Sequence, residues 1–145
     1  MRRLPVTLDL TQYRRFSADE IEAVCKLQTR ELVEAFATVA GIRTRLTPDA
    51  DPRRVYHNIA VAIDPSRQLF NGQPGTIGTW IDALGLASGA RVLHVGCGLG
   101  YYTAVMACAV GQTGRVVAFE VDEALATEAR QNRARRRHSF AGCVA

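Results

Sequence analysis

At 145 residues the chain has the length of a single domain, and its composition, 48% hydrophobic and 22% charged, is ordinary for a water-soluble globular protein. The absence of any run of about 18 apolar residues argues against a membrane-spanning helix. Residues 1–9 contain two arginines but no long apolar stretch, which argues against a secretory signal. We therefore expect a cytoplasmic protein with no membrane partner.

The net charge of +4 is a property of one end of the chain. Residues 130–145 carry five arginines and no acidic residue, whereas the rest of the chain is almost neutral. Such a segment could neutralise nucleic-acid phosphates, but no aromatic residue alternates with the arginines to stack on bases. We favour a solvated charge run, and nucleic acid is not the expected partner.

The four cysteines, Cys25, Cys97, Cys108 and Cys143, are far apart in the sequence and form no C-x-x-C pair. This spacing favours reduced thiols over a disulfide framework or a metal site, so we expect no metal.

The N-terminal third predicts helices followed by a loop. Ser17-Ala-Asp-Glu20 matches a capping box, which predicts that a helix begins there. Apolar residues continue at helical spacing to Val39 after a break near Thr29, and Gly41 is a plausible stop. Residues 42–53 are polar and contain two prolines, which predicts a loop, and the apolar residues 55–63 indicate a strand.

The remaining elements alternate between strands and helices. Residues 71–75 are typical of a turn, and apolar residues at i, i+3, i+4 and i+7 from Ile77 predict an amphipathic helix to Leu84. Residues 91–95 predict a strand, 101–110 a buried helix, 115–120 a second strand and 122–137 a further helix. Because both strands are almost wholly apolar, we expect a parallel sheet that is covered on both faces.

A glycine-rich turn follows the first of these strands. Gly96, Gly98 and Gly100 have the spacing G-x-G-x-G between the strand and the buried helix, and Glu120 ends the second strand. Glycine lets a ligand approach the backbone closely, and the N-terminus of the following helix presents free N–H groups. A carboxylate at the end of the second strand can accept hydrogen bonds from both hydroxyls of a ribose. The pattern predicts a site for a nucleotide-type cofactor.

The glycine spacing discriminates between two classes of cofactor. A dinucleotide fingerprint, G-x-G-x-x-G/A, requires a small residue at position 101, where this chain has Tyr101. The compact spacing therefore favours S-adenosylmethionine, which has no pyrophosphate, over the NAD of an oxidoreductase.

Two segments resemble a known family. Val92-Leu-His-Val-Gly-Cys-Gly-Leu-Gly-Tyr101 is similar to motif I of class I S-adenosylmethionine-dependent methyltransferases. Together with Asn71-Gly-Gln-Pro74 and Arg91-Val-Leu, it resembles the protein-L-isoaspartate O-methyltransferases over about residues 68–130. The resemblance implies a Rossmann-like α/β fold and methyl transfer from S-adenosylmethionine to isoaspartyl carboxylates of damaged proteins or peptides.

The resemblance also assigns site residues. It implies cofactor contacts from the motif, including Gly96, Gly98, Gly100, His94 and Cys97, and a ribose contact from Glu120. It further implies that Gln73 and Pro74 line the mouth of the site, where the methyl donor and the methyl acceptor meet.

The chain departs from the family pattern in three ways. Gly72 replaces a serine before Gln73-Pro74, and His94 replaces an acid at the end of the first strand. We therefore assign no catalytic residue. The family has a seven-stranded sheet, whereas this chain supplies two clear strands, so we expect the N-terminal half of the parallel sheet preceded by helices.

These departures set the expected organisation. We expect a helical segment and loop over residues 1–54, an S-adenosylmethionine-binding β-α-β core over 55–131, and a basic tail over 132–145 that is truncated or frame-shifted sequence. The alternative is a non-catalytic cofactor- or partner-binding fragment that completes its sheet with another chain, and its exposed sheet edge could support self-association.

Overall fold

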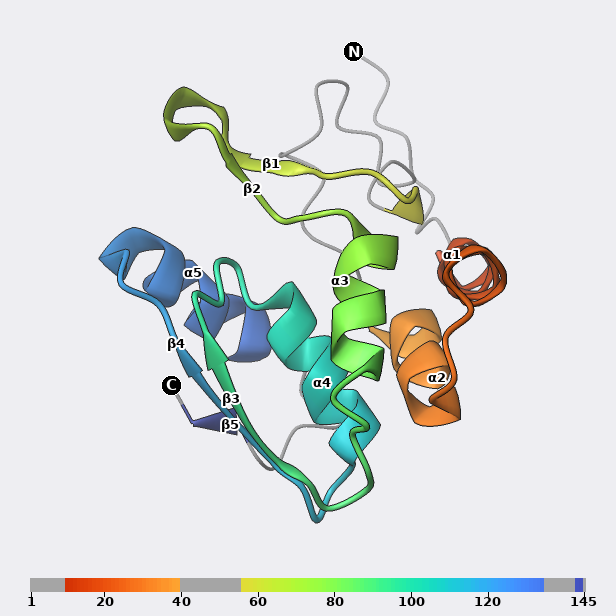
Figure 1. Ribbon diagram of the computed structural model, residues 1–145. Helices are drawn as coiled ribbons and strands as arrows, with labels where there is room; N and C mark the ends of the chain where they lie inside the picture. Colours follow the sequence, from red (N-terminus) through yellow and green to blue (C-terminus); the bar gives the residue numbers. More distant parts are fainter. Residues whose placement is uncertain (1–9, 40–55, 135–142, 145) are drawn as a thin grey trace.

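The structure, a computed structural model, describes residues 10–39, 56–134 and 143–144 (Figure 1). It begins with helices α1 (Thr11–Cys25) and α2 (Arg30–Thr38). The predicted break is confirmed, because Lys26 adopts the left-handed conformation that ends α1, and Thr29 is the extended residue before α2. Gly41 and the loop predicted over residues 42–53 lie outside the described residues.

The capping box predicted at Ser17 is wrong. Helix α1 begins earlier, at Thr11, and Ser17 lies inside it with only 7% of its surface exposed. Ser17 and Ala18 are small residues beside Ile21 on the buried side of the helix. Their role is therefore packing, and the similarity to a cap is a coincidence of residue types.

The start of α2 is held by a carboxylate from another helix. Asp82, the last residue of α3 (Pro74–Asp82), accepts hydrogen bonds from the backbone N–H groups of Gln28 and Thr29, both at 2.8 Å. Burial opposes ionisation of Asp82, but the hydrogen bonds from Thr29 and Gln28 outweigh it and lower its pKa. The carboxylate thus fixes the two residues that lead into α2, although it lies more than fifty residues away in the sequence.

We expect Asp82→Ala to lower the free energy of unfolding by about 2 kcal/mol, because two donors lose a charged acceptor. Since the folded pKa of Asp82 is lowered, its contribution is present above the unfolded pKa and is lost as the pH falls through the folded pKa. Urea denaturation at pH 7 and at pH 3, beside Asp19→Ala as an exposed carboxylate control, measures this. Equal losses for both variants at pH 7 would contradict the assigned role.

A small hairpin follows. Strand β1 (Ala62–Asp64) pairs antiparallel with β2 (Leu69–Phe70), and the 3-10 turn η3 (Pro65–Arg67) joins them. The strand predicted over residues 55–63 is wrong in extent. Asn58 binds the backbone N–H of Gly75 through its side chain and accepts from the Gln73 side chain through its carbonyl, and this local bonding replaces strand pairing.

Helix α3 begins at Pro74, whose missing N–H costs nothing at a first helical position. The predicted amphipathic pattern is only partly correct. Ile81 is buried, whereas Trp80 and Leu84 are 64% and 62% exposed.

The β-α-β unit is confirmed. Strand β3 (Arg91–Val95), helix α4 (Tyr101–Val110) and strand β4 (Arg115–Phe119) follow in order, and the strands pair in parallel with Val95 opposite Phe119. Helix α4 is buried along most of its length, as expected.

Helix α5 (Glu123–Ala134) follows, and the Asp122 carboxylate accepts from the backbone N–H of Leu125 at its start. Residues 135–137 of the predicted helix lie outside the described part.

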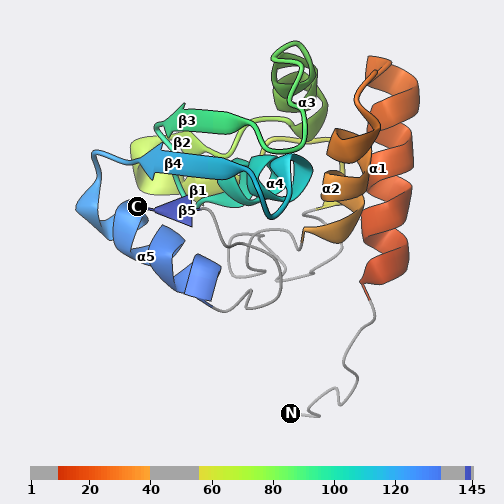
Figure 2. The ribbon, with the colours of Figure 1, turned by 90° about the horizontal axis from the view of Figure 1, so that it is seen from below.

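The sheet has one more strand than expected. Cys143–Val144 forms β5, which pairs in parallel with β4 at Val116 and Val117 and gives the order β3-β4-β5. Residues 143–144 therefore lie in the sheet beside β4 (Figures 1 and 2).

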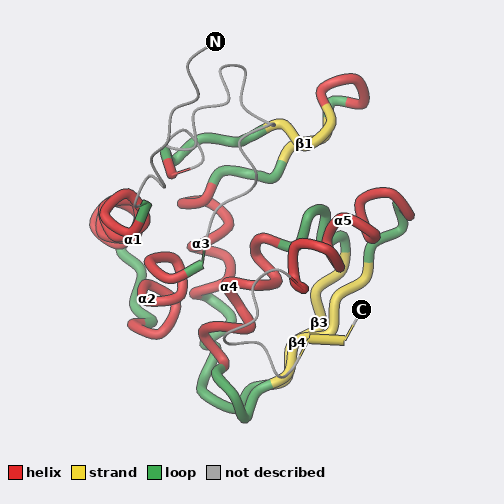
Figure 3. Tube along the Cα trace, turned by 180° about the vertical axis from the view of Figure 1, so that it is seen from behind, coloured by secondary structure: helices red, strands yellow, loops and turns green. Residues whose placement is uncertain are grey.

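One face of the sheet is covered, and the expectation that both would be is wrong for the described residues. Val116 and Ala118 are buried on the side of α4, whereas Leu93, Val95 and Phe119 are 65%, 74% and 58% exposed. Helices α1 to α4 gather on one side of the molecule in the trace from behind (Figure 3), and their apolar side chains join those of β4 in a single core.

Among the described helices, none has both the length and the apolar character that crossing a membrane demands.

Candidate cofactor site

The glycine turn lies at the carboxyl end of β3 and is fastened to β4. The carbonyl of Phe119 accepts from the N–H groups of both Gly96, at 2.8 Å, and Cys97, at 3.1 Å. Gly96, Gly98 and Gly100 all have positive φ, at 74°, 53° and 80°. At Gly96 a Cβ would find no atom within 4 Å, so the backbone there faces open space. The turn thus exposes main chain where a ligand can approach it.

Glu120 is positioned by the backbone on either side of it. Its Oε2 accepts from the N–H of Gly98 at 2.7 Å, and its Oε1 accepts from the N–H of Asp122 at 3.1 Å. A carboxylate offers about four lone-pair sites, so two remain for a ligand. The sequence placed this acid and the glycines in one site, and the structure brings them into direct contact.

A cleft of about 370 Å³ lies between this turn and the β1–β2 hairpin. Its floor includes Gly96, Gly98 and Glu120, and the hairpin supplies Ile63 and Phe70. The cleft therefore opens at the carboxyl ends of parallel strands, which is the usual ligand position in open α/β sheets.

An ion pair joins the two walls of the cleft. The guanidinium of Arg67, in the hairpin, contacts the carboxylates of Asp64, at 2.6 Å, and of Asp122, at the start of α5. Hydrogen bonds from Ser66 and Arg67 lower the pKa of Asp64 to about 2. The pKa of Asp122 is lowered mainly by Arg67 and also by the Leu125 N–H.

Sequence reasoning missed the hairpin as part of the site. Its residues in the cleft have no motif of their own, and residues 55–63 looked like an ordinary strand. Asp64-Pro-Ser-Arg67 was the available signal, since an Asp-Pro pair followed by serine is typical of a turn.

His94 and Cys97 both line the cleft. The Nδ1 of His94 lies 2.8 Å from the Thr103 hydroxyl, and burial lowers the pKa of His94 while the nearby Glu120 carboxylate opposes the shift. The imidazole is therefore neutral at pH 7 and forms a hydrogen bond, not an ion pair. The Cys97 thiol is directed to the Gly98 carbonyl at 3.9 Å.

Gln73 and Pro74 lie apart from the cleft lining. The Gln73 side chain donates to the Asn58 carbonyl at 3.0 Å, and Pro74 is buried as the first residue of α3. Their neighbour Asn71 lines the cleft instead. The structure thus places these two residues as supports for the segment that enters the site.

Within the described segments, no group of three or more His, Cys, Asp or Glu side chains is arranged to hold a metal ion. Cys25, Cys97 and Cys108 are free thiols, and burial raises the pKa of Cys108.

Residues 19–141 match the family model described as protein-L-isoaspartate(D-aspartate) O-methyltransferase, or PCMT. The chain belongs to the PCMT family. The match passes residue 132 and so includes much of the segment for which we predicted sequence unlike the family.

Individual PCMT proteins agree with this assignment. The protein-L-isoaspartate O-methyltransferase of Methanosarcina mazei is 33% identical over 90 residues, which are 62% of this chain and 36% of that protein. A solved protein-L-isoaspartate O-methyltransferase superposes with a TM-score of 0.70 at 25% identity, over 88% of this chain and 41% of that one. A Plasmodium falciparum structure described as PCMT, in complex with S-adenosyl-L-homocysteine, has the same fold, with a TM-score of 0.66 at 17% identity over 90% of this chain and 62% of that one. The chain thus spans only part of each PCMT protein, about half or less in most cases.

Gly72 stands where the family resemblance led us to expect a serine, and the backbone there suits glycine. Gly72 has a φ of 76°, and a Cβ there would lie 2.9 Å from Cγ1 of Ile77. The Gly72 carbonyl also accepts from the Tyr102 hydroxyl at 3.1 Å, and burial of that tyrosine, with a smaller contribution from Tyr101, raises its pKa. Glycine is the residue that this conformation and this crowding permit.

We expect Gly72→Ser, which introduces the residue that the resemblance implies, to lower the free energy of unfolding by about 1–3 kcal/mol through backbone strain and the displacement of Ile77. Thermal denaturation beside Gly85→Ser is the measurement, because Gly85 has a φ of 59° and nothing within 4 Å of its Cβ position. A loss of stability no larger than that of the control would show that the Ile77 side chain moves aside without cost.

Proposed function

We propose that the cleft beside the glycine turn binds S-adenosylmethionine. The observation that carries this proposal is the meeting of two features on one cleft: the open main chain at Gly96 and the spare acceptor sites of Glu120. The S-adenosyl-L-homocysteine of the related P. falciparum structure supports it, because that molecule is the demethylated form of the same cofactor.

The residues present fit this cofactor. Glu120 would hold the ribose hydroxyls, the Gly96–Gly100 backbone would approach the neighbouring atoms, and His94 and Cys97 would line the wall. The buried Tyr101, 7% exposed, fills the position where a dinucleotide fingerprint needs a small residue, which favours S-adenosylmethionine over NAD.

The proposed activity of the whole protein is methyl transfer to isoaspartyl carboxylates of damaged proteins. The cofactor supplies an activated methyl group bonded to a sulfonium. The residues of this chain would bind and orient the cofactor: Glu120 would hold its ribose, and the ion pair between Arg67 and Asp122 would keep the hairpin beside the cleft. Because the chain spans only part of its relatives, methyl transfer and the acceptor are proposals for the whole protein, and we assign no catalytic residue.

Two measurements test the proposal. Isothermal titration with S-adenosylmethionine should give micromolar binding, and a transfer assay with an isoaspartyl peptide reports turnover. Binding without turnover supports a cofactor-binding chain that lacks activity alone, whereas absence of binding by a cooperatively folding chain refutes the proposed site.

A second candidate function is that of a partner-binding chain whose open sheet face is covered by another polypeptide. The exposed apolar side chains of Leu93, Val95 and Phe119 favour it, because parallel sheets are normally covered on both faces. Sedimentation equilibrium of the wild type and of Leu93→Lys tests this function. A monomeric wild type at 100 µM would count against self-association through the sheet.

A further inference from the structure

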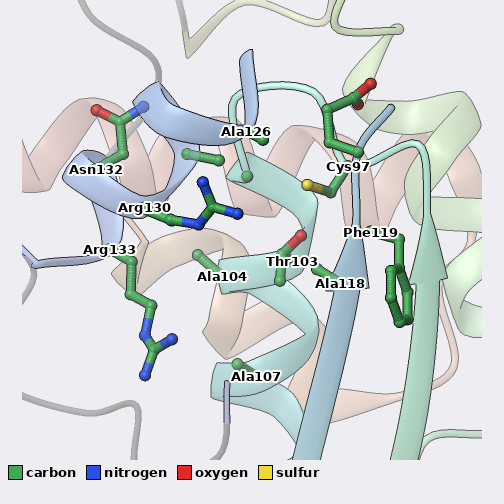
Figure 4. Close-up of a pocket in the computed structure, with 13 residues that line it drawn as sticks. Cys97, Thr103, Ala104, Ala107, Ala118, Phe119, Ala126, Arg130, Asn132 and Arg133 are labelled. Atoms are coloured by element: carbon green, nitrogen blue, oxygen red, sulfur yellow. The ribbon is translucent and has the colours of Figure 1, made fainter. Parts of the chain in front are cut away.

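A second cavity lies below the glycine turn, on the covered face of the sheet, between α4, β4 and α5 (Figure 4). Its volume is about 120 Å³. The wall is largely methyl groups from five alanines: Ala104, Ala107, Ala118, Ala126 and Ala129. We call it the alanine cavity; it shares Cys97 and Glu120 with the cofactor cleft but lies on the other side of the turn.

The packing of α5 explains why the alanine cavity stays open. Helix α5 already touches the glycine turn, since a Cβ on Gly100 would lie 3.4 Å from Ala129, and the Asn132 side chain donates to the Leu99 carbonyl at 3.2 Å. These contacts hold the helix at a fixed distance from α4. The alanine side chains are too short to fill the space that remains.

The rim of the cavity is positively charged. Arg130 and Arg133 line it, and both side chains extend from α5 on the side of the cavity (Figure 4). Neither guanidinium forms an ion pair with the residues that the structure describes. Glu120 also lines the cavity and contributes one negative charge, so these three side chains together carry a net charge of +1 (two arginines and one glutamate). The N–H groups of Gly98 and Asp122 hold its carboxylate at the turn. An apolar chamber with two guanidiniums at its mouth is complementary to a molecule with an apolar body and an anionic end.

We propose that the alanine cavity is a second ligand site, which binds a small apolar carboxylate. An enclosed dry cavity of about 150 Å³ binds benzene, so this cavity of about 120 Å³, which is open at its rim, accepts one ring at most. The carboxylate binds Arg130, and Arg133 adds to the positive potential. This site does not depend on S-adenosylmethionine binding in the cleft.

Benzoate is a suitable probe, and benzyl alcohol is its neutral counterpart of similar size. In NMR titrations of the full chain we expect benzoate to shift the amide signals of α4 and α5, and to bind about tenfold more tightly than benzyl alcohol. Arg130→Gln should weaken benzoate binding about tenfold and leave benzyl alcohol unchanged. Arg115→Gln, which removes the same charge from the open face of the sheet, is the matched control.

A second variant tests the chamber itself. Ala107→Leu should fill it and abolish binding of both probes, while a thermal melt confirms that the variant folds. Equal affinity for the two probes would overturn the proposal. Unchanged benzoate binding in Arg130→Gln or in Ala107→Leu would also overturn it. The same holds if S-adenosylmethionine displaces benzoate and benzoate does not shift the amide signals of α5. Because the readout is benzoate binding, failure here leaves the proposed cofactor site untouched, and the reverse also holds.

Discussion

Replacing Glu120 with glutamine should weaken S-adenosylmethionine binding by about 10- to 100-fold. The carboxylate uses one oxygen for the Gly98 N–H and the other for the Asp122 N–H. Glutamine replaces one acceptor with an NH₂ group, so one backbone donor faces another donor and a ribose hydroxyl loses its charged acceptor. A lost hydrogen bond to a charged group costs about 1.5–3 kcal/mol, and each 1.4 kcal/mol is a factor of ten.

Glu123→Gln is the matched control for this change. Glu123 lies in the first turn of α5, is exposed, and is not part of the cleft lining. Both variants remove one negative charge close to the start of the same helix. Titration calorimetry should separate them clearly, and similar affinities for the two would mean that Glu120 does not hold the cofactor.

Replacing Gly96 with alanine should abolish cofactor binding at concentrations that saturate the wild type, with only a modest effect on folding. A Cβ at Gly96 meets no protein atom within 4 Å, so the methyl group projects into the open space that we assign to the ligand. The cost in stability is the backbone strain of a non-glycine residue at a φ of 74°, about 1–2 kcal/mol.

Gly85→Ala isolates that strain from the effect on the ligand. Gly85 has a φ of 59° and equally open surroundings, and it is not among the residues that line the cleft. Both variants should lose similar stability in urea denaturation, while only Gly96→Ala loses binding. If both bind normally, the open space at Gly96 is not where the cofactor lies.

The site core could be predicted because its physical determinants are local in the sequence. A strand, three glycines, a buried helix and an acid-tipped second strand are consecutive, and their chirality and pairing leave few arrangements. Gly96, Gly98 and Glu120 accordingly meet where the spacing placed them.

The parts that could not be predicted depend on contacts between distant segments. Asp82 of α3 binds the segment that leads into α2, and Arg67 pairs with Asp122, and neither pairing leaves a pattern in the sequence. The prediction at Ser17 failed for a similar reason. Ser17 is buried by contacts between distant segments, and a small polar residue that packs in this way looks the same in the sequence as a helix cap. The open sheet face was missed because an apolar strand reads the same whether or not the chain covers both of its faces.

The most direct test of the account is a crystal structure of this chain soaked with S-adenosyl-L-homocysteine. We predict density along the Gly96–Gly100 backbone, with the ribose hydroxyls within hydrogen-bond distance of Glu120. Density confined to another surface, or an empty cleft in crystals of a chain that binds the compound in solution, would contradict it.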